Sequence, residues 1–490
     1  MSVRIWIVVT TLLAAVAPIC PLRAQALDFA YPFSDPLRTL PVVMDTGAML
    51  PGDTDPIPRS YDKPLSSPLA LTEAVDLALS HNQKVRGAWA DIKVQAAALG
   101  QENSAYLPTV TGTLNWVNDN ISSSNSSSTK SYTSQASARW RLFDFGGRSA
   151  GKNAADNLLA AAVATHDSAL QQALSGVIQA YFDAVTAGAS LKAKVKNEEI
   201  AITILTYARY REAKGIASRL DTLRAITALA RATLEKSRAD GYYRKAEAML
   251  KYSIGVPSTT VLLLPTEFDE NSANTVTGKE LSAWLEETLR NHPAIVAARK
   301  QRDAAIKQVA VARSSGLPTM DLSGAFSQGS YSGVAVSPGS METTVTVAIA
   351  IPIFDGFATT YKVRGAEAKV EKETAALTDV EQQIIMGVIK AYGDASSALL
   401  NLDASVALLK AAQGALEVSQ RKYDKGAADI TEVLSTQTAL ADAWNERIRT
   451  QAEWQSARLQ LLTSAGKMGR SVLINGEGNL RPDGGGSSTK

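Results

Sequence analysis

Residues 71–109 read LTEAVDLALSHNQKVRGAWADIKVQAAALGQENSAYLPT, and residues 281–319 read LSAWLEETLRNHPAIVAARKQRDAAIKQVAVARSSGLPT. The two stretches align without a gap at an offset of 210 residues, which places Leu79 on Leu289. Beyond them the offset becomes 211, since Phe143-Asp144 aligns with Phe354-Asp355. A register held over this distance predicts tandem copies of one supersecondary unit. Such a duplication favours a modular architecture over an enzyme built around one catalytic cleft.

The first 26 residues have the pattern of a secretory signal peptide. Arg4 precedes an apolar run from Ile5 to Val16, and Ala24-Gln25-Ala26 fits a cleavage site. The run is too short for a transmembrane anchor. Cys20 is the one cysteine of the chain, and its surroundings lack the pattern of a lipidated cysteine. We therefore expect a mature chain without thiols, which excludes disulfides and cysteine metal sites.

Removal of the signal peptide changes the charge balance. The whole chain has 50 Lys and Arg against 48 Asp and Glu. Arg4 and Arg23 leave with the leader, so 50 − 2 gives 48 basic against 48 acidic residues. A neutral mature chain gives no electrostatic reason to expect a nucleic-acid partner.

The segment 27–68 contains eight prolines. Because proline fixes φ and removes a backbone donor, this segment is either an extended arm that lies on the rest of the protein or a disordered leader. Two further segments are expected to lie outside the repeats, a linker over 266–279 and a polar, Gly/Ser-rich tail over 467–490.

The two repeats, 69–265 and 280–466, each read as helix, strand, strand, long helix and helix. The first helix, about 69–106, is expected to stop before Pro108. The strands are expected at 109–119, 132–143, 319–328 and 342–354. The serine-rich stretch 122–131 is expected to be a solvated loop. The fold class is therefore mainly α with a β part.

Apolar and polar residues alternate along all four strands. Leu114 and Trp116 share one face of the first strand, Trp140 and Leu142 one face of the second, and Val347 and Ile349 one face of the fourth. This length and alternation are typical of lipid-facing barrel strands. Four strands are too few to close a barrel, so they form a small soluble sheet or several chains pool them.

The long helices are expected at 149–214 and 359–425, and each would reach about 100 Å. Their apolar residues follow a heptad seam, which predicts coiled-coil packing; in the second repeat the seam is Val388, Tyr392, Ala395, Leu399, Leu402, Val406 and Leu409. Return helices are expected at 220–253 and 430–464. Gly215 and Gly426 sit between the helices of each pair, where a glycine in the left-handed conformation ends a helix.

No catalytic or metal-binding constellation is present in the sequence. His81, His166 and His292 lie far apart, and His81 and His292 are expected at the surface. Phosphate loops, nucleophile elbows and zinc-binding helix motifs are missing. The sequence therefore predicts a protein without enzymatic activity, cofactor or metal.

The duplicated motifs resemble the TolC family of outer-membrane channels. They are Leu-Pro-Thr after the first helix, Phe-Asp at the end of the second strand, Ala-Tyr within the long helix and a glycine-led turn between the long helices. In this sequence they stand as Tyr106-Leu107-Pro108-Thr109, Phe143-Asp144-Phe145-Gly146, Ala180-Tyr181, residues 215–223, Asn291-His292-Pro293, Leu317-Pro318-Thr319, Phe354-Asp355-Gly356, Ala391-Tyr392 and residues 426–434.

This resemblance implies a homotrimer in the outer membrane of a Gram-negative bacterium. Three chains with four strands each would close a twelve-stranded β-barrel in outer-membrane lipid, and the long helices would form a periplasmic α-helical barrel. Such channels act with a periplasmic adaptor, or membrane fusion protein, and an inner-membrane ABC or proton-driven pump. They export small molecules in efflux or polypeptides in type I secretion.

The resemblance also places a gate at the tips of the helical hairpins. Asp221, Glu432 and Tyr423 match the residues that close the periplasmic aperture in the family, and three copies of a carboxylate there would select cations. Arg219 and Asp429 lie beside them, and Arg219 or Arg211 would replace a latch arginine that is missing at Ala428. The alternative is that Asp221 and Glu432 are solvated charges at helix starts, where the helix dipole favours them.

The same tips are the expected docking surface for the adaptor, because small or apolar residues there allow a helix to approach closely. These residues are Gly215, Ala217, Leu220, Gly426, Ala427 and Ala428. A different class of protein also fits the coiled-coil pattern, namely a structural or adhesive protein of the cell envelope. The strands distinguish the channel from this alternative, since a structural coiled-coil stalk has no need of a lipid-facing apolar surface.

Overall fold

The computed structural model describes residues 35–46, 68–121, 127–265, 280–332 and 340–469. The predicted signal peptide 1–26, the linker 266–279 and most of the tail lie outside these residues, as does most of the arm. The chain divides into two units, Met1–Arg38 and Thr39–Lys490. In the first unit, the backbone amide of Arg38 donates to the carbonyl of Asp35 at 3.2 Å. All the described helices and strands belong to the second unit.

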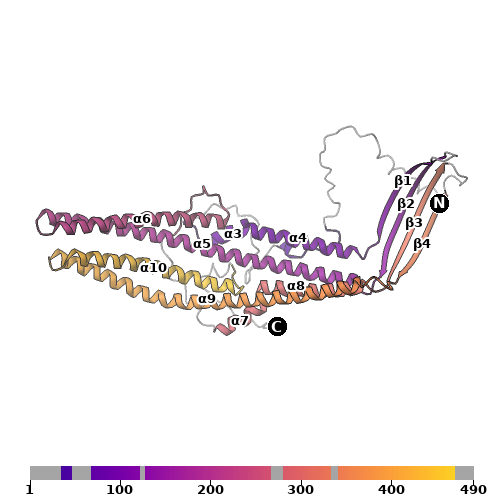
Figure 1. The fold of residues 1–490 in the computed structure, drawn as a ribbon. Helices are drawn as coiled ribbons and strands as arrows, with labels where there is room; N and C mark the ends of the chain where they lie inside the picture. Colours follow the sequence, from indigo (N-terminus) through magenta and orange to yellow (C-terminus); the bar gives the residue numbers. More distant parts are fainter. Residues whose placement is uncertain (1–34, 47–67, 122–126, 266–279, 333–339, 470–490) are drawn as a thin grey trace, which may run out of the picture. The chain divides into compact units, whose positions relative to one another are not determined.

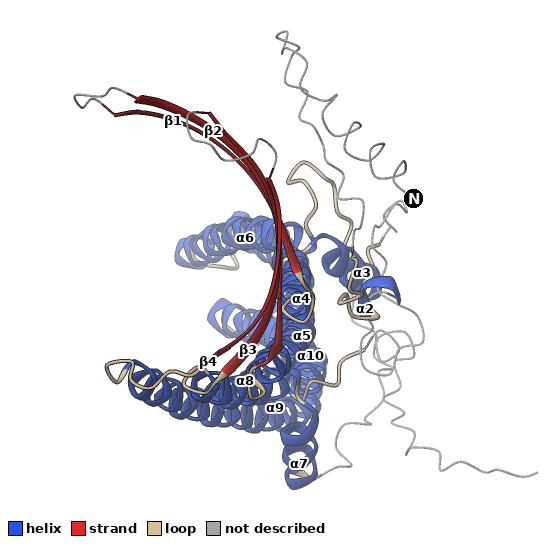
Figure 2. Ribbon diagram, turned by 90° about the vertical axis from the view of Figure 1, so that its right-hand side faces the viewer, coloured by secondary structure: helices blue, strands red, loops and turns tan. Residues whose placement is uncertain are grey.

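The four strands form one antiparallel sheet in the order β1-β2-β3-β4 (Figure 1). Their bounds are Thr109–Ile121 for β1, Ser127–Phe143 for β2, Thr319–Ser332 for β3 and Ser340–Ala350 for β4. Strands β2 and β3 come from different repeats, so their pairing joins the repeats into one curved layer (Figure 2). Because β2 begins at Ser127, the expected serine-rich loop was too long: its last five residues extend the strand.

Each repeat contributes two long helices that form an antiparallel hairpin. The helices α5 (Gly147–Ala213) and α9 (Ala358–Asp424) contain 67 residues each. They are followed by α6 (Arg219–Ile254) and α10 (Ile430–Ser464). At 1.5 Å per residue α5 and α9 span about 100 Å. In Figure 1 the hairpins extend away from the sheet.

The expected single helix over 69–106 is two helices, α3 (Leu71–His81) and α4 (Gln83–Ser104). The break lies at Asn82, whose side-chain Oδ1 accepts from the amide of Lys84 at 2.9 Å. An asparagine that caps the next helix in this way ends the preceding one. The second repeat has the same break, with α7 (Leu281–Asn291) and α8 (Pro293–Ser314) separated by His292.

The duplicated Phe-Asp motif turns the chain from strand to long helix. Asp144 accepts the amide of Arg148 at 2.8 Å, and Asp355 accepts the amide of Thr359 at 2.8 Å. Each aspartate thereby satisfies a free amide at the start of α5 or α9 and complements the helix dipole. Both turns contain a left-handed phenylalanine, Phe145 with φ 50° and Phe357 with φ 68°.

The main core lies where the short helices α3 and α7 pack against the long ones. Trp284, Ile178 and Leu461 are among its fully buried side chains. The hydroxyl of Tyr181 donates to the carbonyl of Leu69 at 2.9 Å, and burial raises its pKa to about 12. Of the predicted proline-rich arm, residues 43–46 form the short helix α2. Val43 packs against this main core, and Met44 packs against a smaller apolar cluster between α4 and α5. This part of the arm therefore lies on the rest of the protein.

The predicted heptad seam of α9 matches the buried residues near Val388 but is out of register by one residue near Val406. Val388 and Ala395 are buried, but Val406 is 48% exposed. Ser405 takes its place at the helix interface, where its hydroxyl accepts from Thr450 at 2.9 Å. An α-helix drifts relative to a strict seven-residue repeat, so a pattern fitted at one end need not hold at the other.

Candidate functional site

The tips of the two hairpins have equivalent turns. Gly215 and Gly426 have φ values of 72° and 74°, which side-chain-bearing residues rarely adopt. The amide after each glycine returns to the last turn of the long helix: that of Ile216 donates to Arg211, and that of Ala427 to Lys422, both at 2.9 Å. These glycines therefore end α5 and α9 as the sequence predicted.

The acidic tip residues lie at the starts of the return helices. Ser218 and Asp221 form a reciprocal capping box, in which the amide of Asp221 donates to Ser218 Oγ at 3.3 Å and the amide of Ser218 to Asp221 Oδ2 at 3.2 Å. Asp429 is the N-cap residue of α10, and Glu432 lies in its first turn. Asp221 therefore has a structural role at a helix start, the alternative that the sequence left open.

Each of these carboxylates has a basic partner. Arg224 Nη1 lies 4.0 Å from Asp221 Oδ1 and 3.6 Å from Asp429 Oδ2. Lys422 Nζ lies 3.4 Å from Glu432 Oε1. The tips therefore present paired charges instead of isolated carboxylates, and within one chain this geometry does not favour a purely acidic ring.

Two arginines of the first hairpin reach the second. Arg211 is buried, donates through Nη1 to the carbonyl of Tyr423 and lies with its guanidinium 4.5 Å above the Tyr423 ring. Arg224 donates to Thr431 Oγ1 at 3.0 Å. Arg219, by contrast, pairs with Glu212 of its own hairpin at 3.3 Å. Of the two cations considered from sequence, Arg211 bridges the hairpins in this structure.

Tyr423 is buried between the hairpins and not exposed at the aperture. It is 5% exposed, and its ring meets that of Tyr207 edge to face at 5.9 Å. Burial raises its pKa, and Arg211 acts in the opposite direction. Its hydroxyl has no hydrogen-bond partner among the described residues. Tyr423 therefore joins the hairpins through its ring and its backbone carbonyl.

Sequence reasoning missed Arg224. The signal was available, since Arg224 follows Asp221 by three residues and the two must share a face of α6. What the sequence could not show is that α6 and α10 approach each other at this level.

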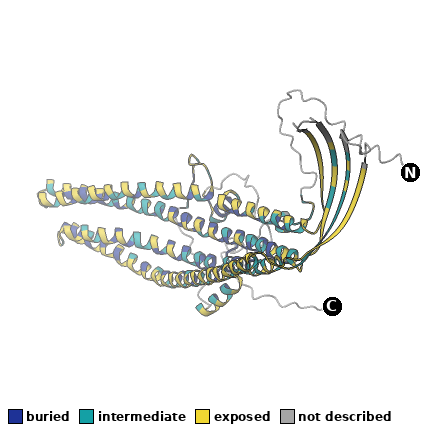
Figure 3. Cartoon of the chain, turned by 45° about the vertical axis from the view of Figure 1, so that its right-hand side comes forward, coloured by how far each residue is buried: buried dark blue, intermediate teal, exposed yellow. Residues whose placement is uncertain are grey.

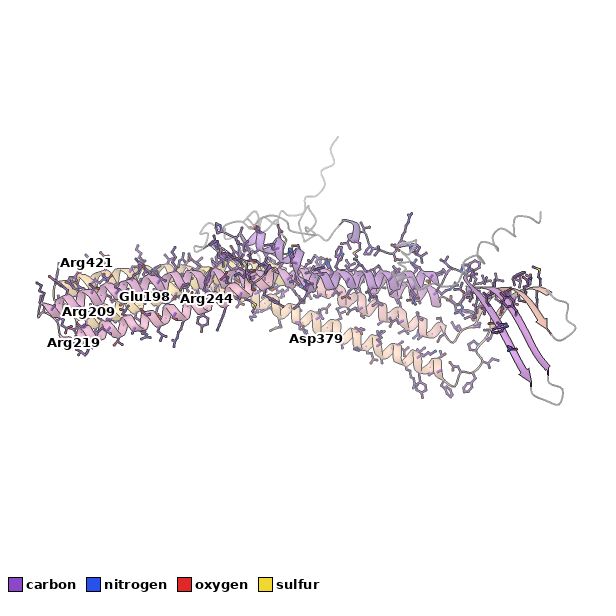
Figure 4. The ribbon with its side chains drawn as sticks, turned by 90° about the horizontal axis from the view of Figure 1, so that it is seen from above. Glu198, Arg209, Arg219, Arg244, Asp379 and Arg421 are labelled. Atoms are coloured by element: carbon purple, nitrogen blue, oxygen red, sulfur yellow. The ribbon has the colours of Figure 1, made fainter. Side chains whose placement is uncertain are left out.

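The expected docking residues lie at the surface of the tips. Gly215, Leu220, Gly426 and Ala427 are exposed, and Ala217 and Ala428 are partly exposed. The first tip also exposes Ile216 and Leu223. Figure 4 shows Arg209, Arg219 and Arg421 at this end of the helices.

One face of the sheet is apolar and exposed. The strand register places Val110 opposite Ala138, Trp140 opposite Leu322, and Leu322 opposite Val347. Among the described side chains of this face there is no charged group. Its predicted members are Leu114 and Trp116, each 73% exposed, Val347 and Ile349, 59% and 61% exposed, and Trp140 and Leu142, 41% and 37% exposed. In Figure 3 the described parts of the strands are coloured mostly as exposed or intermediate.

The described residues contain no group of three metal-ligating side chains. They also contain no helix with the length and apolar content needed to cross a membrane. The expectation that His292 is a surface residue was wrong: it is 5% exposed, its Nδ1 accepts the amide of Ala294 at 3.2 Å, and burial lowers its pKa to about 4. His81 is exposed, as expected.

A sheet with one exposed apolar face, free of charge among its described side chains and joined to long helical hairpins, defines a protein of the membrane-channel class. Comparison with known proteins agrees. The family model described as "Outer membrane efflux protein" matches residues 74–256 and 284–467. Protein CyaE of Bordetella pertussis is 34% identical over 430 residues, covering 87% of this chain and 90% of that protein. Outer membrane protein TolC of Escherichia coli is 22% identical over 40% of this chain and 42% of that one.

Solved structures show the same fold. The CusC channel superposes with a TM-score of 0.73 at 18% identity, covering 86% of this chain and 99% of that chain. The outer-membrane channel MtrE of Neisseria gonorrhoeae, solved in an open state, superposes with a TM-score of 0.71 at 20% identity, covering 86% and 98%.

The chain belongs to the outer membrane efflux protein family. It is the outer-membrane channel of an export system, and the channel extends into the periplasm. The resemblance inferred from the duplicated motifs is confirmed. The structural or adhesive alternative is set aside.

Proposed function

We propose that three copies of this chain form one continuous channel-tunnel, which receives its substrate from an inner-membrane pump through a periplasmic adaptor. The observation that carries the proposal is the exposed apolar face of a sheet whose outer strands, β1 and β4, each have one neighbour in a single chain. Unpaired strand edges cannot remain in the hydrocarbon of a bilayer, because their backbone groups lack partners there. Three copies of the sheet, closed edge to edge, remove both free edges.

The helical part supports the same assembly. Much of the first half of α9 is exposed in one chain, including Tyr361 at 68% and, in the turn before it, Phe354 and Phe357 at 75% and 62%. Apolar surface of this kind, continuous with the sheet, is typical of an interface. Copies arranged around an axis would cover it while the hairpins enclose the tunnel.

In this proposal the hairpin tips form the periplasmic gate and the adaptor docks on them. Arg211–Tyr423 and Arg224–Asp429 hold the two hairpins of one chain together. Tyr423 is part of the first contact, and Arg219, Asp221 and Glu432 lie at the starts of α6 and α10 at the same tips. Gly215, Ala217, Leu220, Gly426, Ala427 and Ala428 supply the close-approach surface. Breaking the inter-hairpin contacts would let the tips separate.

The residues of the tips and of the sheet do not indicate which class of substrate is exported. Relatives that are 22% identical to this chain are named for different cargo, such as the Dickeya chrysanthemi "Proteases secretion protein PrtF" and the Pseudomonas putida "Pyoverdine export outer membrane protein OpmQ". A generic tunnel accepts what the pump delivers, which is consistent with this range.

Cysteine cross-linking tests the closure. Since Cys20 is the one natural cysteine and precedes the predicted cleavage site, cysteines introduced singly and in pairs at alternate positions of β1 and β4 would be the only thiols of the mature chain. We expect oxidised pairs to give covalent trimers in the outer-membrane fraction, and single variants to give none. Monomers in the soluble fraction, or the absence of cross-links across all pairs, would reject the closed trimer.

A further inference from the structure

The polar face of the sheet carries a compact ion cluster at the seam between the two repeats. Arg141 on β2 lies directly opposite Asp321 on β3. Arg141 Nε donates to Asp321 Oδ1 at 2.9 Å, and Arg139 Nη2 donates to Asp321 Oδ2 at 2.8 Å. One carboxylate thus fixes two guanidinium groups on neighbouring positions of the same face.

The charges of this cluster do not balance. Two arginines against one aspartate leave one positive charge per chain. The Asp321 side chain is 12% exposed, whereas those of Arg139 and Arg141 are 67% and 44% exposed. The carboxylate is therefore covered by its partners, and the surface of the cluster is cationic.

Asp144, directly after β2, acts electrostatically on Arg141, but it is itself paired with Arg148 at 3.1 Å and so does not cancel the excess. Among the described side chains of the polar face, the other charged group is Glu342, which pairs with Ser327 on β3. Ser327 lies six residues beyond Asp321, which corresponds to about 20 Å along the strand. At physiological ionic strength the screening length is about 8 Å, so Glu342 does not neutralise the cluster.

We propose that Arg139 and Arg141, held in place by Asp321, form a binding site for anionic groups of the molecule in transit. The inference rests on the proposed function, because only closure of the sheet turns its polar face into a lumen. Three copies would then place six arginines and three aspartates at one level, near the ends of the strands that join the helices. Rings of arginine are a recurrent means of favouring anions in pores.

The geometry of the arginines suits this role. Arg139 contacts Asp321 through one nitrogen, Nη2, which leaves the other donors of its planar fork available to a second acceptor. A guanidinium group binds carboxylate and phosphate oxygens in pairs, and its bonds to charged acceptors are about twice as strong as those between neutral groups. The cluster therefore recognises carboxylate or phosphate groups in preference to cations.

A purely structural role is the competing explanation, because the cluster also bridges the two repeats. The two roles predict different effects of Asp321→Asn on anion binding. As a structural bridge, Asp321 strengthens the sheet and its loss weakens the trimer without a change in anion binding. As the support of an anion site, its neutralisation raises the net charge and strengthens anion binding.

The test uses the full-length protein in a planar lipid bilayer, with inositol hexakisphosphate added on the side of the strand loops. We expect the concentration that halves the current to rise at least about tenfold in the Arg139→Gln/Arg141→Gln variant, since two charge-assisted contacts are lost. The matched control is Arg231→Gln/Arg244→Gln, which removes two charges from α6, where these side chains are 75% and 76% exposed. Figure 4 labels Arg244 among the long helices, away from the strands. The control should stay within about twofold, because charges on α6 lie far from the arginine cluster of the sheet and their effect there is screened.

Further measurements on Asp321→Asn and on the wild type distinguish the anion site from a purely structural cluster. Asp321→Asn should lower the half-blocking concentration and shift the reversal potential in a KCl gradient further toward anions. Equal block in the wild type, the double variant and the control would overturn the proposal. If the double variant does not assemble, Arg139→Gln alone, a change at the more exposed arginine, keeps the test open. Absence of any conductance in the wild type would reject the channel-tunnel instead.

Discussion

Arg224 of α6 lies 3.6 Å from Asp429 of α10 and donates to Thr431 Oγ1 at 3.0 Å, so that one side chain joins the tips of the two duplicated hairpins. The side chains of Arg224 and Asp429 are 41% and 62% exposed. Exposed ion pairs contribute about 0.2–1 kcal/mol each, which is small for the fold but sufficient to bias a gate between two arrangements.

Arg224→Gln should therefore increase the open probability of single channels about two- to fivefold at low salt, with the fold unchanged. Asp429→Asn should act in the same direction but less strongly, because Arg224 also contacts Asp221 and Thr431, and the double variant should add little to Arg224→Gln, because both changes remove the Arg224–Asp429 ion pair. Arg231→Gln is the control, since Arg231 pairs with Glu235 within α6. Additive effects of the two gate variants would contradict the assignment.

The ring of Tyr423, and not its hydroxyl, should hold the tips together. Because the buried hydroxyl has no hydrogen-bond partner among the described residues, Tyr423→Phe should change stability by less than about 0.5 kcal/mol or increase it. Arg211→Met removes a buried charged donor and should destabilise the tips by about 2–3 kcal/mol. The rate of amide hydrogen exchange at the ends of α5 and α9 measures the stability change in each variant. Faster exchange in Tyr423→Phe than in Arg211→Met would show that the hydroxyl is the essential group.

The two faces of β1 should respond oppositely to charge. Leu114 is on the apolar face, so Leu114→Lys should destabilise the membrane-inserted protein by about 2–4 kcal/mol if it lies near the bilayer midplane. Thr113, its neighbour on the polar face, should accept lysine with little change in assembly. Folding into lipid vesicles, followed by heat-resistant migration on gels, compares the two. Equal tolerance at both positions would argue against lipid contact.

Buried His292 should make stability depend on pH in a defined window. Its pKa is about 4 in the folded chain and ordinarily about 6.5, so the unfolded state binds more protons between these values. Stability should therefore rise with pH from 4 to 6.5, by up to about 3 kcal/mol, and stay level above.

His292→Asn should flatten that dependence. Asn82 occupies the aligned position of the first repeat and caps α4 through its side chain, so asparagine supplies the acceptor that His292 Nδ1 provides to the amide of Ala294. Urea unfolding of detergent-solubilised protein at pH 4.5 and 7.5 measures the slope. A slope unchanged by the substitution would show that other groups cause it.

The duplication and the strand alternation were accessible from sequence because both are periodic. Offset motifs such as Phe143-Asp144 and Phe354-Asp355 predicted repeated turns, and the register confirmed that Leu114, Trp140 and Val347 belong to one face. The break at Asn82 was missed because its cap is a local side-chain bond within an otherwise helical pattern. The shift from Val406 to Ser405 was missed because the packing partner, Thr450, is distant in sequence.

The amino-acid sequence by itself determined the repeat, the order of the elements, the glycine turns and the sidedness of the strands, since these follow from local backbone preferences and from spacing along the chain. The tertiary structure alone decided which charges meet. Arg224 reaches Asp429, Arg211 covers Tyr423, and Arg139 and Arg141 converge on Asp321 because the two repeats pack side by side. Ion pairs depend on distances of a few ångströms between residues about 180 to 210 positions apart, and no period in the sequence encodes such distances.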